Sequence, residues 1–183
     1  MIYHLYLQNA GLLAGIVLCL VGLIGFGLHG TARSAAASFP RSRLAGVLLL
    51  TVDLVWTLWL VSTMEMGEFS VFRRPFLIAL PVLFFLSIRF VDEFLAVRAL
   101  GILLLLAAEP LLEAAFFRYE NARLVLTVLA YLLIVLGLIW VTMPYLLRDQ
   151  ITWLSKTTAR WRGLHALSFV YGAALIALAL FCY

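Results

Sequence analysis

The chain has 183 residues, of which 66% are hydrophobic and only 12% are charged, with a formal net charge of +4. Soluble domains are about half apolar and about a quarter charged, so these ratios exclude a soluble globular protein, a disordered chain and a nucleic-acid binder. A membrane-spanning helix needs about 20 mostly apolar residues. We therefore expect an all-α, polytopic bundle of transmembrane helices that forms one integral membrane domain over residues 1–183 and has the lipid bilayer as its solvent.

Six apolar runs, joined by short polar linkers, are the predicted spans. In chain order they cover about residues 9–28, 44–63, 75–91, 94–116, 122–147 and 164–183. The third run is the shortest and carries Pro81, so a re-entrant segment and a tilted helix both stay open for it. The linker before the last run has Ile151, Leu154, Thr158 and Trp161 at helical spacing. This spacing predicts a short amphipathic helix in the membrane interface, with a disordered basic loop as the alternative.

The basic residues predict an orientation. With six spans, the first, third and fifth linkers share one side of the membrane, and they hold nine of the 13 Lys and Arg residues. Because basic residues concentrate in cytoplasmic loops, this bias places these three linkers in the cytoplasm and both termini outside. We expect a multi-pass protein of the bacterial cytoplasmic membrane.

Small residues on the first run predict a close helix–helix contact. Gly11 and Gly15 form a GxxxG pattern, and Gly22 and Gly25 continue on nearly the same helix face. In lipid, glycines let two helix backbones approach each other, and packing then drives association. The sequence leaves open whether this seam joins two helices of one chain or two copies of the protein.

Asp53 is the most informative polar residue, because it lies halfway along the second run. A carboxylate at the bilayer centre costs on the order of 3 kcal/mol on insertion scales, so it should face the bundle interior and be paired or protonated. Trp56 and Thr57 follow three and four residues later, and we expect their N–H and O–H groups to donate to it. Two interpretations remain, a polar lock between helices and a proton or cation site.

A second pair of acids lies on the fourth run. Glu109 and Glu113 are four residues apart on one helix face, and Pro110 between them favours a kink that lines a polar cavity. We expect Glu113 at the outer interface, where Arg118 or Arg123 would neutralise it. Structural pairing and an ion path are the main alternatives. Acid–base catalysis is the remaining one, although no nucleophile, metal set or catalytic motif accompanies the two acids.

The histidines suggest one further possibility. His29 ends the first predicted span and His165 begins the last, so both lie at the same depth, as two axial haem ligands would. Interfacial histidines without a ligand role are the simpler interpretation, and we expect neither a cofactor nor a metal.

The sequence leads to three ranked hypotheses about function. The first is a non-enzymatic accessory or assembly subunit that packs against a membrane-protein partner or against further copies of itself. The second is a small secondary transporter, or a proton or cation pathway, that uses Asp53 and Glu109. The third is a membrane redox subunit that holds a tetrapyrrole.

Overall fold

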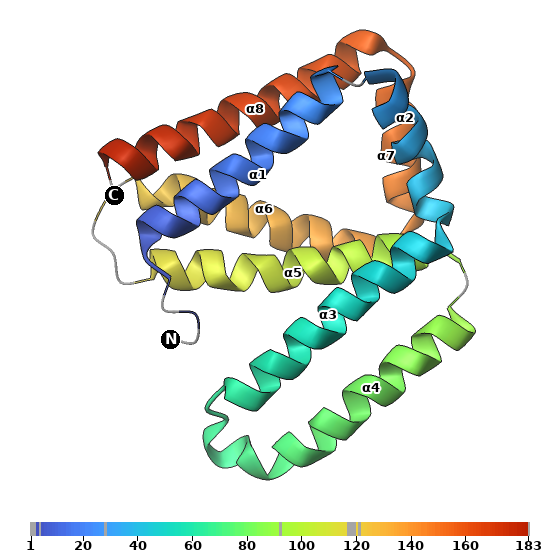
Figure 1. Cartoon of the computed structure of the whole chain (residues 1–183), viewed down its shortest axis with the longest axis vertical. Helices are drawn as coiled ribbons and strands as arrows, with labels where there is room; N and C mark the ends of the chain where they lie inside the picture. Colours follow the sequence, from blue (N-terminus) through green and yellow to red (C-terminus); the bar gives the residue numbers. More distant parts are fainter. Residues whose placement is uncertain are drawn as a thin grey trace.

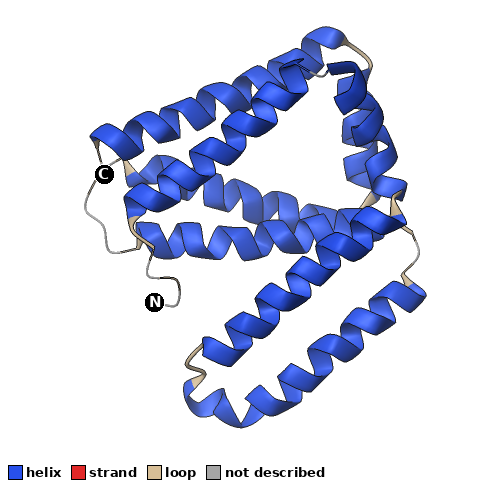
Figure 2. Ribbon diagram, viewed as in Figure 1, coloured by secondary structure: helices blue, strands red, loops and turns tan. Residues whose placement is uncertain are grey.

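The computed structural model describes residues 3, 5–27, 29–91, 93–116, 120 and 122–182, with only the backbone of His29. In this part of the chain every regular element is helical, and no strand occurs (Figure 2). Six helices are long and apolar enough to cross a membrane. The expected all-α bundle with six candidate spans is therefore confirmed.

The long helices follow the predicted spans closely. They are α1 (Leu7–Gly27), α3 (Arg43–Thr63), α4 (Arg73–Phe90), α5 (Leu95–Ala115), α6 (Arg123–Thr142) and α8 (Thr158–Phe181). The third span is longer than predicted, because the 3-10 helix Gly67–Phe72 continues directly into α4 and the two together make 24 residues. Its length is therefore that of a full crossing.

The fifth predicted span, 122–147, was wrong at its end. Helix α6 stops at Thr142, and Pro144 is the N-cap of the next helix, which begins at Tyr145. Proline lacks a backbone N–H and its ring collides with the preceding helical turn, so a helix ends before it. The last span begins earlier than predicted, since α8 starts at Thr158 and takes up the basic residues before position 164.

Two short helices connect the long ones at one end of the bundle. They are α2 (His29–Ser38), which the sequence had left as a linker, and α7 (Tyr145–Ser155), and they contact each other. The predicted amphipathic stripe does not form one helix. Thr157 has an extended backbone, which separates Ile151 and Leu154 on α7 from Trp161 on α8. Figure 1 shows α2 and α7 crossing the ends of the long helices.

The long helices pack as antiparallel pairs. Helix α1 lies against α8, and α5 lies against α6 (Figure 1). The α3–α4 hairpin joins the rest through α3 and α5, and its far end stands away from α1 and α8. Helix α4 has no buried residue. The hairpin is therefore the part of the bundle with the least support from the rest of this chain.

Glycines determine where the helices of each pair approach. On α1, a Cβ atom placed at Gly15 would lie 2.8 Å from the carbonyl oxygen of Gly172 on α8, and one at Gly172 would lie 2.7 Å from the oxygen of Gly15. Gly101 on α5 and Gly137 on α6 face each other in the same way, at 2.9 and 2.8 Å. Any side chain at these positions would collide with backbone, so only glycine permits these crossings.

The glycine stripe predicted on the first span therefore lies inside the bundle. Gly11, Gly15, Gly22 and Gly25 are all buried, and the last three contact α8. Gly22 packs against the backbone of His165 and Phe169. This places the seam between two helices of one chain.

Candidate functional site

Asp53 lies on the middle of α3 and faces the other helices of the bundle. It is 3% exposed and is the single buried charged residue in the described ranges. Neither of its carboxylate oxygens has a hydrogen-bond partner there. A buried polar group without a partner is costly and rare in folded proteins. Asp53 and its surroundings therefore form a candidate functional site.

A cavity of about 160 Å³ adjoins this carboxylate, where α3, α4 and α5 meet. Apolar side chains form most of its wall, and Asp53, Thr57 and Ser87 supply the polar atoms. The full lining is Leu50, Asp53, Leu54, Thr57, Leu80, Leu83, Phe84, Ser87 and Ile102. The carboxylate of Asp53 therefore adjoins a partly open cavity whose lining includes two hydroxyl groups.

The expected donors to Asp53 bond elsewhere. The Thr57 hydroxyl donates to the backbone carbonyl of Asp53 at 2.7 Å, as threonine commonly does one helical turn after an acceptor. The Trp56 indole N–H donates to the Tyr3 hydroxyl at 2.7 Å, because this side chain projects from α3 away from the carboxylate. The prediction that these two residues satisfy the carboxylate was wrong.

Tyr3 links the segment before α1 to two helices. Its ring contacts Trp56 and Trp59 on α3, and its backbone N–H donates to the Glu113 carboxylate on α5 at 3.2 Å. Burial raises the pKa of the Tyr3 phenol, and the negative charges of Glu109 and Glu113 raise this pKa further. The phenol therefore stays protonated at neutral pH, where its oxygen accepts from Trp56.

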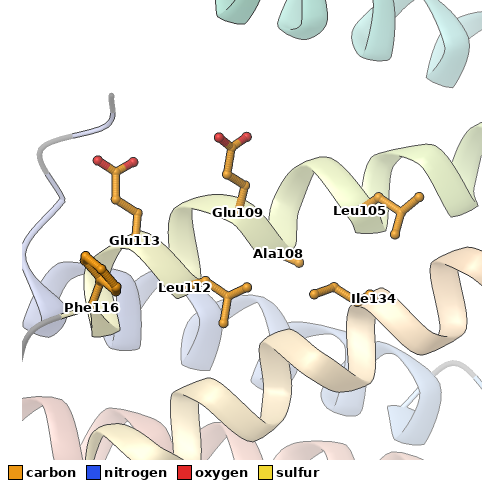
Figure 3. Close-up of a pocket in the computed structure, with 7 residues that line it drawn as sticks. All are labelled: Leu105, Ala108, Glu109, Leu112, Glu113, Phe116 and Ile134. Carbon is orange, nitrogen blue, oxygen red and sulfur yellow. The ribbon is translucent and has the colours of Figure 1, made fainter. Parts of the chain in front are cut away.

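The second pair of acids lies in an open pocket of about 500 Å³ on the C-terminal half of α5. Figure 3 shows the Glu109 and Glu113 side chains projecting from the same side of α5, while Leu112 and Ile134 lie below them. The other lining residues are Leu105, Ala108 and Phe116. Glu109 is exposed although it lies within a helix of membrane-spanning length. Helix α5 continues through Pro110 to Ala115.

Of the two arginines expected to neutralise Glu113, only Arg123 lies within the described residues. Arg123 directs its guanidinium to the backbone carbonyl of Ala115, at 3.4 Å. Arg118 lies outside the described residues. The exposed carboxylate of Glu109 thus presents negative charge to the pocket.

Asp53 and the two acids of α5 line different pockets. Asp53 is ten residues from the start of α3, and Glu109 is fourteen residues from the start of α5. At a rise of about 1.5 Å per residue, Glu109 lies roughly 6 Å farther along its helix than Asp53 does along α3. Among the described residues, none lines both cavities. The sequence left open whether Asp53 and Glu109 share a cavity, and the structure gives them separate ones.

Of the two histidines in the haem hypothesis, only His165 has a described side chain. The His165 ring covers Gly25, so closely that a Cβ atom there would lie 2.2 Å from the ring, and it stacks near Trp161 with ring centroids 4.8 Å apart. His29 begins α2, and its side chain is outside the described part. Among the residues described, no three His, Cys, Asp or Glu side chains cluster to hold a metal.

Two residues near these sites were not foreseen. Ser87 is the single hydroxyl-bearing residue in the apolar core of the third run. This isolated polar residue was the one signal in the sequence that could have indicated its role. Tyr3 precedes the first span, and nothing in its sequence surroundings indicates that it folds back onto α3 and α5.

Comparison with known proteins gives no function for these sites. The chain matches no protein family, no curated protein and no solved structure. Function has to be argued from the sites themselves.

Proposed function

We propose that the protein is a non-enzymatic assembly subunit that binds another membrane-spanning segment through the acidic pocket on α5. The exposed carboxylate of Glu109 carries this proposal. A charged side chain that faces hydrocarbon is unfavourable, and such residues almost always pair with another group or line a polar cavity. A cationic residue on an apolar helix would meet the Glu109 carboxylate while its apolar side chains cover the pocket wall.

The shape of the bundle supports a missing partner. Helix α4 contributes no buried residue, and the outer part of the α3–α4 hairpin stands away from α1 and α8 (Figure 1). Within the membrane, association depends on packing between helices, and this hairpin leaves much of its surface unpacked. A partner helix bound in the α5 pocket would lie on the same side of the bundle as the unpacked surface of the α3–α4 hairpin.

The proposed orientation places the basic end of the bundle in the cytoplasm and both termini outside. Helices α2 and α7 lie at this end, with Arg33 and Arg148 on them. In the described part of the chain, four guanidinium groups lie over aromatic rings at this end, as suits an interface between lipid and water. These pairs are Arg33 with Trp161, Arg148 with Phe94, Arg160 with Trp153 and Arg162 with Phe26.

Site-specific photo-crosslinking in native membranes tests the assembly proposal. A photoreactive residue at Leu112, which lines the acidic pocket, is expected to give one discrete protein adduct. The control is the same residue at Val170 on α8, which is 63% exposed and lies far from the acids in sequence. An adduct of twice the chain mass identifies a second copy as the partner, and any other discrete mass identifies a different protein.

Equal adduct formation from Leu112 and Val170, or none from Leu112, would show that lipid alone covers the pocket and would refute the proposal.

A second candidate function is a cation or proton pathway. The observation in its favour is that the two acidic pockets lie at neighbouring depths along α3 and α5. Carboxylates inside membranes often mark such routes. This candidate requires water or a movement of the hairpin to join two pockets that share no lining residue. The assembly proposal requires no such movement, so it is preferred.

A further inference from the structure

The Asp53 cavity combines a buried acidic side chain with a partly open space between three helices. The carboxylate is 3% exposed, and both oxygens lack a partner in the described chain. Removing an ionised carboxylate from water without a compensating group costs several kcal/mol. The cavity beside it is therefore where a compensating positive charge would sit.

The lining restricts what that charge can be. Its polar side chains are the Asp53 carboxylate and the hydroxyls of Thr57 and Ser87, so every side-chain ligand offered is an oxygen. Among the described residues, no other titratable side chain and no side-chain nitrogen lines the cavity. Oxygen ligands suit hard cations, and a single carboxylate balances a single charge, whereas Ca²⁺ and Mg²⁺ sites usually recruit more oxygens or carboxylates.

We propose that this cavity binds one Na⁺ ion through the carboxylate of Asp53, with the hydroxyl oxygens of Ser87 and Thr57 as further ligands. Thr57 gives its proton to the backbone carbonyl of Asp53, which leaves its lone pairs free to face an ion. A volume of about 160 Å³ has room for the ion and several waters. The ion site requires neither a partner protein nor transport, so it goes beyond the assembly role.

Ion binding would hold the hairpin to the bundle. Asp53 and Thr57 belong to α3, Ser87 belongs to α4, and Ile102 of α5 also lines the cavity. Helix α4 buries no residue of its own. One ion between these helices would therefore stabilise the contact of the α3–α4 hairpin with α5, which hydrophobic packing supports least. A ligand that binds only the folded state raises the melting temperature of the protein.

Thermal unfolding of the purified full chain in lipid nanodiscs tests the site. At pH 8 and constant ionic strength, replacing choline chloride by NaCl is expected to raise the melting temperature of the wild-type protein by several degrees. Asp53→Asn is expected to abolish this rise, while Glu68→Gln, an exposed acid on the 3-10 helix, is expected to keep it. Binding of ²²Na⁺ by the wild type should saturate at one ion per chain.

A second variant covers the case in which Asp53→Asn does not fold. Ser87→Ala removes one ligand and little volume, so it should fold and bind ²²Na⁺ about tenfold more weakly. Equal melting of the wild type in NaCl and choline chloride, or a sodium effect that persists in Asp53→Asn, would overturn the proposal. A melting temperature that responds to pH but not to sodium would also overturn it, because the carboxylate would then be neutralised by a proton alone.

Discussion

Replacing Gly15 with leucine is expected to prevent the bundle from reaching its native fold. A Cβ atom at this position would already lie 2.7 Å from Cγ1 of Ile176 and 2.8 Å from the backbone oxygen of Gly172. Overpacking a well-packed site typically costs about 1–3 kcal/mol even where side chains can shift. Here the obstacle includes backbone, so α1 and α8 would have to separate. The total stability of a domain is only about 5–15 kcal/mol.

The measurement is thermal unfolding together with the monodisperse fraction after purification in detergent. Gly27→Leu and Gly163→Leu are matched controls on the same two helices, because a Cβ atom at either position meets nothing within 4 Å. Both controls should keep the wild-type melting temperature to within a few degrees. Wild-type melting of Gly15→Leu would show that α1 and α8 do not cross at their glycines.

The second large effect concerns the acidic pocket. Glu109→Lys is expected to abolish recovery of the partner that crosslinks to Leu112. It replaces a negative charge by a positive one opposite the proposed cationic residue. Leaving one member of a buried ion pair without its partner costs about 3–5 kcal/mol, which corresponds to a loss of affinity on the order of a hundredfold or more. Glu109→Gln, which removes the charge and nearly keeps the shape, should weaken recovery to a smaller extent.

Recovery is measured by co-purification from native membranes at equal expression. Glu65→Lys, which changes an exposed acid in the linker after α3, is the control and should leave recovery unchanged. The melting temperature of Glu109→Lys should stay near that of the wild type, because Glu109 is exposed in the isolated chain. Full recovery of the partner with Glu109→Lys would refute the role of this charge.

Composition and the spacing of apolar runs were sufficient to predict the six long helices. Their ends were harder to predict, because hydropathy alone does not separate the end of a span from an interfacial helix. The run 122–147 shows this, since it joins α6 to the first turn of α7 across Pro144. Helix α2 was missed because HGTARSAAAS is weakly apolar and lacks a strong helical stripe.

The candidate site was predicted in part. Asp53 and Glu109 stand out in the sequence because charges within spans are costly. The residues of other helices that meet the predicted positions do not stand out in the sequence, because a contact between distant helices leaves no trace in local spacing. Ser87 reaches the Asp53 cavity from α4, and Gly172 meets Gly15 from α8. The donors expected three and four residues after Asp53 failed because Thr57 bonds to its own helix and Trp56 faces Tyr3.

The central claim is that the chain crosses the membrane six times with its basic end in the cytoplasm, and cysteine labelling tests it most directly. In a Cys19→Ala background, a membrane-impermeant maleimide applied to intact cells should label Cys182 and a Ser70→Cys variant of the 3-10 helix before α4. It should label a Ser34→Cys variant of α2 only after permeabilisation. Labelling of Ser34→Cys in intact cells, or protection of Cys182 there, would contradict the account.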